Sequence, residues 1–169
     1  YLMRQRRRAL WVSAGLIALM SGILLYPSQP GTTYWSPYQK LLLTERSGGE
    51  GRFYHIDVNN TFYQTIESAA QRMDHHRFPY QFVPKPERVL LVGAGAGNDA
   101  AAALEHGARQ VDAVDIDPVI LSLGERLHPE RPYSSERVTR ILDDARAFFK
   151  KAQGPYDLIA YTRLDSHTL

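Results

Sequence analysis

The apolar residues of this chain fall into one long run and several short runs. The long run, Ala9 to Tyr26, contains no charged residue and follows a basic segment with four arginines between residues 4 and 8. The short runs begin at Val89 and alternate with glycine turns and segments of helical periodicity. A long uncharged run is typical of a membrane helix, whereas short apolar runs of this kind are typical of buried strands in an α/β sheet.

The run from Ala9 to Tyr26 is about as long as a helix must be to cross the core of a bilayer. We therefore expect a transmembrane helix there. A cleaved secretory signal is one alternative because the basic segment precedes the run, but no A-x-A-like site follows and the run ends at Pro27 and Pro30. A buried core helix is the other alternative, although a helix that is apolar all round would find little to pack against in a small domain.

The region between Gly31 and Pro86 changes to short alternating segments. Lys40 to Thr44 and Arg52 to Val58 have the pattern of strands, and the glycine-rich segment between them has the composition of a hairpin turn. These features predict a small β-hairpin subdomain. Thr65 to Arg77 is expected to be a helix, since its apolar residues recur at helical spacing; the residues on that face are Ile66, Ala69, Ala70 and Met73.

A glycine-rich turn follows the first short apolar run. Val89 to Val92 is apolar at every position, as in a strand buried on both faces, and it leads into GAGAG and an alanine-rich helix. Glycines let a ligand approach the backbone and a helix start offers unpaired N–H groups, although glycine also serves tight turns for structural reasons alone. Asn98 replaces the last glycine of the dinucleotide motif, which disfavours NAD. Ligand contact is expected at Gly93, Gly95, Gly97 and Asp99.

Asp115 is the last residue of the second predicted strand, which begins at Gln110. Ligands of open α/β sheets bind at the carboxyl ends of the strands, so this carboxylate lies where a ligand would bind. Its separation from the glycine turn also matches the acidic residue that binds ribose hydroxyls about 20 residues further on. We therefore predict that Asp115 binds a ribose. Asp117 precedes Pro118, and this pair predicts a helix cap instead.

The third predicted strand, Arg137 to Leu142, runs into Asp143, Asp144 and Ala145. Two carboxylates at this position can bind the exocyclic amine of an adenine or cap the following helix, and the residues alone leave both interpretations open. A fourth strand, Tyr156 to Tyr161, completes a series of alternating strands and helices. The series predicts a Rossmann-like α/β fold with a parallel sheet and helices on both faces.

The expected organisation has three parts: residues 1–30 as basic flank and transmembrane helix, 31–86 as β-subdomain and linker helix, and 87–169 as an incomplete Rossmann-like domain. The first residue is Tyr1 rather than methionine, and the chain stops soon after the fourth strand. These two features led us to expect a fragment of a longer protein.

Composition narrows the classes of partner. The 169 residues include 20 Lys and Arg and 18 Asp and Glu, a net charge of +2, and much of the basic excess lies in the N-terminal segment, so nucleic acid is not implied. The chain has no cysteine, which excludes disulfides and thiolate metal sites. His75 and His76 are adjacent and lack a third ligand at metal spacing, so we expect no metal.

Taken in order, the glycine turn, Asp115, the D-D-A segment and the Y-D-L-I strand resemble the class I S-adenosylmethionine-dependent methyltransferase superfamily. Within it they are most similar to the polyamine aminopropyltransferases, such as spermidine synthase, and the resemblance runs from about Trp35 to the end of the chain. It implies that Asp115 holds the ribose of the donor and Asp144 the adenine. It also implies a nucleoside contact for Gln39 in the S-P-Y-Q segment, and a substrate-side role for Tyr63 and Gln64.

Two positions depart from the family pattern. The glycine loop of the family is G-G-G-D-G-G, whose aspartate faces the aminopropyl end of the donor, and Ala96 occupies that place here. The family's D-S-S-D stretch follows the fourth strand and begins with the residue that accepts the proton of the attacking amine. Thr162 stands at that first position and Asp165 at the second. Asp165, followed by Ser166 and His167, is the candidate base if it can reach the amine.

Two functions remain open from the sequence. The first is a transferase that uses S-adenosylmethionine or its decarboxylated form to donate a methyl or aminopropyl group to a small nucleophile such as a polyamine. The second is a catalytically inactive nucleotide-binding sensor or structural domain. The protein is expected at an inner or plasma membrane with its soluble domain on the cytoplasmic side, although the arginine-rich flank leaves the orientation open. The oligomeric state also stays open, a homo-oligomer among the options.

Overall fold

The computed structural model describes residues 2–25, 30–49 and 51–162, and the chain divides into two compact units at Pro30 and Gly31. The first unit contains one helix, α1 (Leu2–Leu25), which begins before the basic segment, so that the apolar run is only part of it. Among the residues that the structure describes, no helix is both long and apolar enough to cross a membrane. The transmembrane helix predicted over Ala9 to Tyr26 is therefore not supported, and the location of the protein in the cell stays a prediction.

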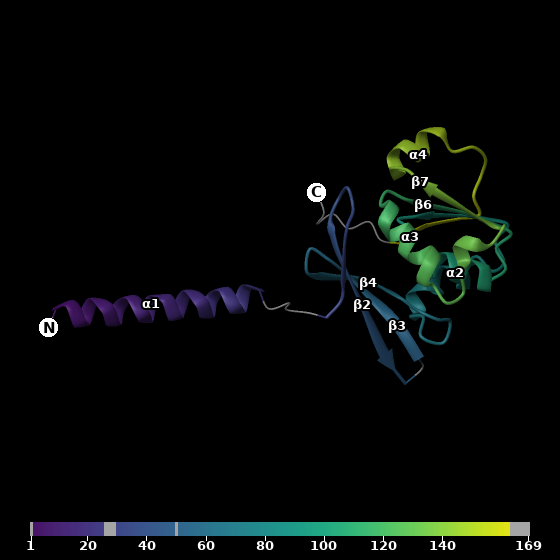
Figure 1. The fold of residues 1–169 in the computed structure, drawn as a ribbon. Helices are drawn as coiled ribbons and strands as arrows, with labels where there is room; N and C mark the ends of the chain where they lie inside the picture. The colour runs from purple at the N-terminus through teal and green to yellow at the C-terminus, as the bar shows by residue number, and fades with distance from the viewer. Residues whose placement is uncertain (1, 26–29, 50, 163–169) are drawn as a thin grey trace. The chain divides into compact units, whose positions relative to one another are not determined.

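The second unit opens with a four-stranded antiparallel sheet in the order β1-β2-β3-β4 (Figure 1). Its strands are β1 (Thr32–Trp35), β2 (Lys40–Gly48), β3 (Gly51–Val58) and β4 (Thr61–Ile66). The pairing of β2 with β3 runs from Leu41 opposite Val58 to Gly48 opposite Gly51. The sheet shares one compact unit with all that follows it, so a separate hairpin subdomain is not confirmed.

The helix predicted from Thr65 to Arg77 is wrong. Thr65 and Ile66 end β4, and turns lead into two 3-10 helices, η1 (Asp74–His76) and η2 (Phe78–Gln81). Asn98 gives the reason, because its amide donates to the carbonyl of Thr65 at 2.9 Å and accepts from the N–H of Glu67 at 3.2 Å. These tertiary contacts override the local helical periodicity.

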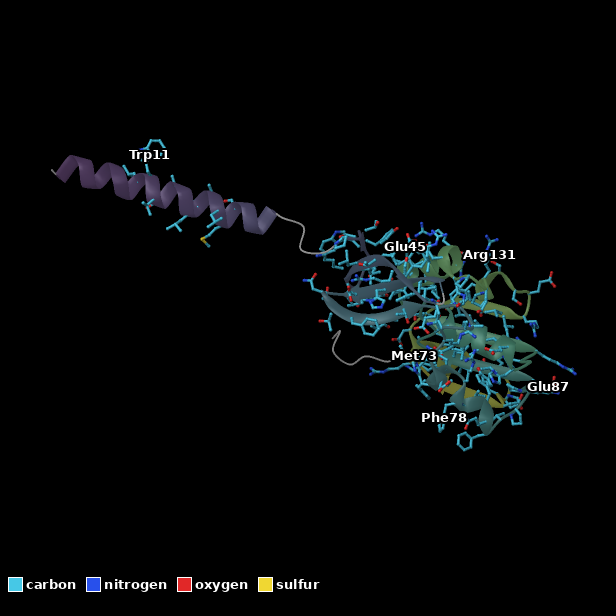
Figure 2. All side chains as sticks on the ribbon, turned by 90° about the horizontal axis from the view of Figure 1, so that it is seen from below. Trp11, Glu45, Met73, Phe78, Glu87 and Arg131 are labelled. Carbon is cyan, nitrogen blue, oxygen red and sulfur yellow. The ribbon has the colours of Figure 1, made fainter. Side chains whose placement is uncertain are left out.

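The exposure of Met73 also contradicts the helix predicted from Thr65 to Arg77. The predicted helix would have buried Met73 on its apolar face, yet this side chain is 50% exposed. Figure 2 shows Met73 and Phe78 at the surface of the second unit. After Ile66, which is buried at the end of β4, the segment packs through polar residues: Glu67, Arg72 and His76 are buried.

The second sheet is parallel and has the strand order β7-β6-β5-β8. Its strands are β5 (Arg88–Val92), β6 (Gln110–Asp115), β7 (Val138–Leu142) and β8 (Leu158–Tyr161). The chain first steps from β5 through β6 to β7 and then returns to the other side of β5. This order is the first part of a Rossmann-like sheet, in which ligands bind where the strand order reverses, at the carboxyl ends of the strands.

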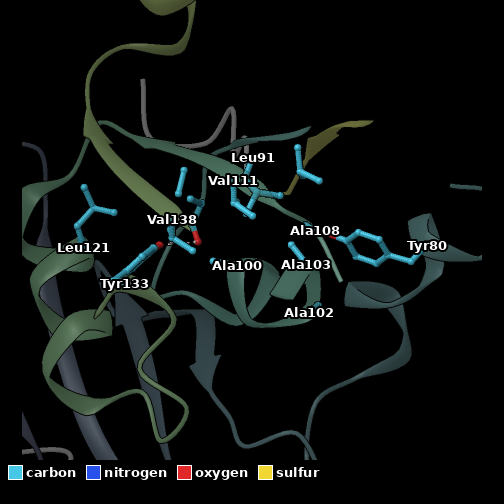
Figure 3. Close-up of a cluster of buried hydrophobic side chains, with 13 residues drawn as sticks. Tyr80, Leu91, Ala100, Ala102, Ala103, Ala108, Val111, Leu121, Tyr133 and Val138 are labelled. Carbon is cyan, nitrogen blue, oxygen red and sulfur yellow. Dashed lines mark hydrogen bonds between the residues drawn. The ribbon is translucent and has the colours of Figure 1, made fainter. Parts of the chain in front are cut away.

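Helices cover both faces of the parallel sheet, as the alternation of strand side chains requires. On one face Leu91 and Ala113 pack against the alanines of α2 (Asn98–Glu105). Figure 3 shows this cluster, with Tyr80 at one end and Tyr133 toward the other. On the opposite face Leu90 and Val92 pack against Phe148 of α4 (Ala145–Lys151). All four residues from Val89 to Val92 are almost fully buried, as the sequence predicts.

Helix α3 (Pro118–Leu127) joins the two sheets. Its Leu121 belongs to the core beneath the parallel sheet, whereas Ile120 and Leu123 pack with Leu41 and Ile56 of the antiparallel sheet. Gly124 brings this helix against the glycine turn, since a Cβ there would lie 2.4 Å from the carbonyl oxygen of Ala96. The carboxyl edge of the parallel sheet and the antiparallel sheet therefore meet around α3.

Candidate functional site

The carboxylate of Asp115 is hydrogen-bonded to the backbone of the glycine turn. Its Oδ2 atom accepts a hydrogen bond from the N–H of Gly95 at 2.8 Å, and its Oδ1 atom accepts one from the N–H of Asp117 at 2.9 Å. Burial raises the pKa of the Asp115 carboxyl above its ordinary value, and the backbone hydrogen bonds oppose that shift. Each carboxylate oxygen keeps further acceptor capacity, so the side chain can still accept hydrogen bonds from a pair of hydroxyls.

Gln64 closes over the same turn from β4. Its Oε1 atom accepts a hydrogen bond from the N–H of Ala96 at 3.1 Å. The side chain is buried, and within the described part of the chain its Nε2 atom has no hydrogen-bond partner. Buried polar groups are seldom left unpaired, so an orphaned donor beside a backbone turn marks a place for an acceptor atom of a ligand.

Gln39 reaches the site from the loop between β1 and β2. Its Nε2 atom donates to Oδ2 of Asp117 at 3.2 Å, while Oδ1 of Asp117 accepts from the N–H groups of Val119 at 2.9 Å and Ile120 at 3.3 Å. The predicted helix cap at Asp117 is thereby confirmed. The hydrogen bond from Gln39 also brings a residue of the antiparallel sheet region to the carboxyl edge of the parallel sheet.

The acidic pair after β7 lies beside Asp115. The N–H of Asp143 donates to the carbonyl of Asp115 at 3.1 Å, and the carboxylate of Asp143 forms an ion pair with Lys151 at 2.6 Å. Asp144 caps α4, which begins at Ala145, by accepting a hydrogen bond from the N–H of Ala147 at 3.0 Å. The capping interpretation of Asp144 is thus observed, and the adenine contact of this segment stays a prediction.

Thr162 follows β8 and contacts the start of the glycine turn. Its hydroxyl donates to the carbonyl of Gly93, and its N–H donates to the carbonyl of Val92 at 3.0 Å. A neutral hydroxyl that already donates its proton to a backbone carbonyl cannot serve as the base that the resemblance implies at this position. Asp165, the candidate base from the sequence, lies outside the described residues.

Two other predicted site residues contact partners other than Asp115. Tyr63 is half-buried and packs against the core between α3 and the antiparallel sheet. Asp99 lies in the first turn of α2, where its Oδ1 atom is 2.7 Å from Nδ1 of His76. We did not predict a role for His76, and no local spacing indicates one, because its partner lies 23 positions further along the chain.

A cavity of about 630 Å³ opens beside this pair. One wall comes from η1 and η2, another from Asp99 of α2, and a third from β8 up to Thr162. Within the part of the chain that the structure describes, no group of three histidine or acidic side chains forms a metal site. The titratable side chains that line the cavity are His75, His76, Tyr80, Asp99 and Tyr161.

Together, a parallel sheet with a glycine turn and an acidic residue at a strand's carboxyl end define a Rossmann-like α/β domain. Its family is shown by comparison with known proteins. The chain belongs to the spermine/spermidine synthase family, because the model of the spermine/spermidine synthase domain matches residues 67–169.

Curated relatives carry two kinds of name. A polyamine aminopropyltransferase of Vibrio vulnificus (strain CMCP6) is 39% identical over 98 residues, which cover 53% of this chain and 32% of that protein. Putrescine N-methyltransferase 3 of Nicotiana tabacum is 29% identical over 143 residues, which cover 77% of this chain and 38% of that protein. The chain thus spans less than half the length of these relatives.

Solved structures share the fold. The crystal structure of spermidine synthase from Thermotoga maritima superposes with a TM-score of 0.65 at 16% identity and covers 79% of this chain and 46% of that one. A spermidine synthase in complex with the transition state analogue AdoDATO superposes with a TM-score of 0.64, also at 16% identity, and covers 80% of this chain and 47% of that one. The Rossmann-like α/β fold with its parallel sheet is therefore shown.

Proposed function

We propose that this chain is the donor-binding part of a transferase that moves an alkyl group from an S-adenosyl donor to an amine. The observation that carries the proposal is the position of Asp115 and Gln64 on either side of the glycine turn. Asp115 bonds the N–H of Gly95, and Gln64 bonds the next N–H, that of Ala96. Both side chains keep hydrogen-bonding capacity that the described residues do not use.

The residues fit a nucleoside donor in chemical terms. Asp115 would accept hydrogen bonds from ribose hydroxyls, and Nε2 of Gln64 would donate to an acceptor atom of the donor. Gln39, Gly93, Gly97 and the segment from Asp143 to Ala145 would complete the contacts. The sulfonium of such a donor activates the adjacent carbon toward a nucleophile, and the chain's own contribution is to hold the donor in one orientation beside the acceptor.

The transferred group is methyl or aminopropyl, and the names of the relatives include both. The donor is accordingly S-adenosylmethionine or decarboxylated S-adenosylmethionine, and the acceptor is an amine of the polyamine class. Both reactions are displacements at carbon by an amine, so they place the same demands on Asp115 and Gln64. Whether a methyl or an aminopropyl group is transferred depends instead on how the protein binds one end of the donor. That end carries an amino group and, in S-adenosylmethionine, a carboxyl group as well.

A nucleotide-binding domain without catalytic activity is the second candidate. Thr162 favours it, because this hydroxyl bonds to Gly93 and does not replace the carboxylate that the family has at this position. Both candidates would bind the donor at the same site, but only the transferase would catalyse the transfer of a group from it.

Calorimetric titration of the full-length protein with S-adenosylmethionine, decarboxylated S-adenosylmethionine and methylthioadenosine tests the proposal. Preference for the decarboxylated donor would indicate aminopropyl transfer, and preference for S-adenosylmethionine would indicate methyl transfer. Asp115→Ala is expected to abolish binding, whereas Asp74→Ala, which removes an exposed carboxylate outside the site, is expected to leave it unchanged. Binding of none of the three compounds would overturn the proposal, and binding without turnover toward any amine would favour the second candidate.

A further inference from the structure

We infer that His76 and Asp99 form the proton-accepting pair of this enzyme, with His76 as the base for the acceptor amine and Asp99 as its positioning residue. This inference rests on the proposed function, since it assigns the acceptor end of the same site. It places the acceptor in the cavity of about 630 Å³ beside β8. It also accounts for the base that Thr162 does not supply.

The geometry of the pair is that of an oriented imidazole. Nδ1 of His76 lies 2.7 Å from Oδ1 of Asp99, and the two side chains are 5% and 14% exposed. A carboxylate bonded to one ring nitrogen fixes the proton on that nitrogen and leaves the lone pair on the other. Nε2 of His76 is therefore the atom that can accept a proton. Among the described residues, Oδ2 of Asp99 has no partner and can face a cation.

Two residues that line the cavity are directly linked to the glycine turn. Asp99 lies in the first turn of α2, and the N-cap of that helix is Gly97, the last residue of the glycine turn. Thr162 lines the cavity from the opposite wall, and its hydroxyl bonds to Gly93, the first residue of the turn. An acceptor in this cavity therefore lies next to a donor held at the turn.

Among the described residues, the titratable side chains near the pair include His75, Tyr80, His128 and Tyr133. The rings of His75 and His76 are tilted at 40° with their centroids 4.0 Å apart, and Tyr80 of η2 lines the same cavity. Burial, followed by the charge of Asp99, raises the pKa of Tyr80 far above its ordinary value, so this phenol stays protonated. His128 is within electrostatic reach of both Arg72 and His76, and burial keeps it neutral.

The proposed proton transfer balances without a further reactant. An amine arrives as an ammonium ion, and passage of one N–H proton to Nε2 of His76 frees its lone pair. The lone pair forms the new N–C bond while the C–S bond breaks and its electron pair stays on sulfur. The products are an alkylated ammonium, a neutral thioether and an imidazolium paired with Asp99, which then releases its proton to water.

Two variants of the full-length protein test the roles separately. In His76→Gln we expect the transfer rate to fall by about 100-fold or more, the size typical of losing a general base. The rate of this variant should recover as the pH approaches the amine's own pKa. Asp99→Asn should weaken the binding of putrescine, measured by calorimetry without donor, by about tenfold, because the carboxylate facing the ammonium is lost. His55→Gln removes an imidazole from the antiparallel sheet and serves as the matched control.

Donor affinity separates a failure of this inference from a failure of the proposed function. If wild type binds no donor, the proposed function fails and this inference falls with it. If wild type binds donor and turns over while His76→Gln keeps its rate within about threefold from pH 6 to 9, only the inference is overturned.

Chemical rescue covers the case in which loss of the side chain perturbs folding. Free imidazole should restore part of the activity of His76→Ala, because it can occupy the vacated space and accept the proton. A purely structural role for His76 would give no rescue that depends on the imidazole concentration, and that result would overturn the inference.

Discussion

The backbone of Gly95 lies against the side-chain amide of Gln64. A Cβ on Gly95 would be 2.6 Å from Oε1 of Gln64, and the residue has a φ of +58°, in the left-handed region. Oε1 of Gln64 is at the same time the acceptor for the N–H of Ala96. The turn and the strand β4 thus fit together only when position 95 has no side chain.

Gly95→Ala should therefore destabilise the protein by about 1–3 kcal/mol, through a strained backbone and a displaced Gln64. Thermal unfolding followed by circular dichroism measures the loss. Gly49→Ala is the matched control, since a Cβ there has no atom within 4 Å. Equal effects of the two substitutions would contradict the packing described for Gly95.

Asp115→Asn should destabilise the fold even without ligand. The amide can accept from one of the two N–H groups of Gly95 and Asp117 but must turn its NH₂ toward the other, which leaves a buried donor unsatisfied at a cost of about 1–3 kcal/mol. Urea unfolding of the wild type and the variant at neutral pH checks this. A variant as stable as the wild type would show that these hydrogen bonds contribute nothing net.

The pH dependence of the same substitution has a defined sign. The folded pKa of Asp115 is raised above the value of 3.8 for an unperturbed aspartate, so the folded state binds the proton more tightly than the unfolded state. The stability from this group is complete below about pH 4 and is lost as the pH rises through the folded pKa. Relative to Asp115→Asn, wild type should therefore be more stable at pH 4 than at pH 7. The opposite order in urea unfolding would rule out a raised pKa.

His128 should make the fold sensitive to mild acid. Burial lowers its pKa to about 3; its Nε2 lies 3.2 Å from Oδ1 of Asn98, and its Nδ1 accepts from the N–H of Glu130 at 3.3 Å. Because the unfolded chain takes up this proton near pH 6.5, stability is complete above that pH and falls by about 1.4 kcal/mol per pH unit below it. His128→Gln should flatten the slope between pH 6 and 4 in chemical unfolding. An unchanged slope would mean that His128 is protonated in the folded state.

Positions whose role depends on their neighbours in sequence could be predicted. Val89 to Val92 is buried on both sides because each of its residues is apolar, and Asp117 caps α3 because Pro118 follows it. Asp115 lies at the carboxyl edge for a similar reason, since the strand before it and the helix after it are both locally specified. The Rossmann-like half of the fold follows from such local patterns.

Positions whose role depends on distant residues could not be predicted. The segment from Thr65 to Arg77 has helical periodicity, but Asn98 holds its first residues extended. The side chain of Arg72 is fully buried, and its guanidinium forms ion pairs with Glu105 and Glu130, which lie 33 and 58 residues away. His76 was missed for the same reason, because the residue that orients it belongs to another element.

The contact between Gly124 and Ala96 has a mechanical consequence. No side chain separates helix α3 from the glycine turn, and the same helix packs Ile120 and Leu123 into the antiparallel sheet. A close-packed interface of this kind transmits displacement instead of absorbing it. Leu41 of β2 and Ile56 of β3 also share a buried cluster with Ala96 of the turn. Any tightening of the glycine turn is therefore passed to β2 and β3, and amide exchange in these strands should report on what occupies the turn.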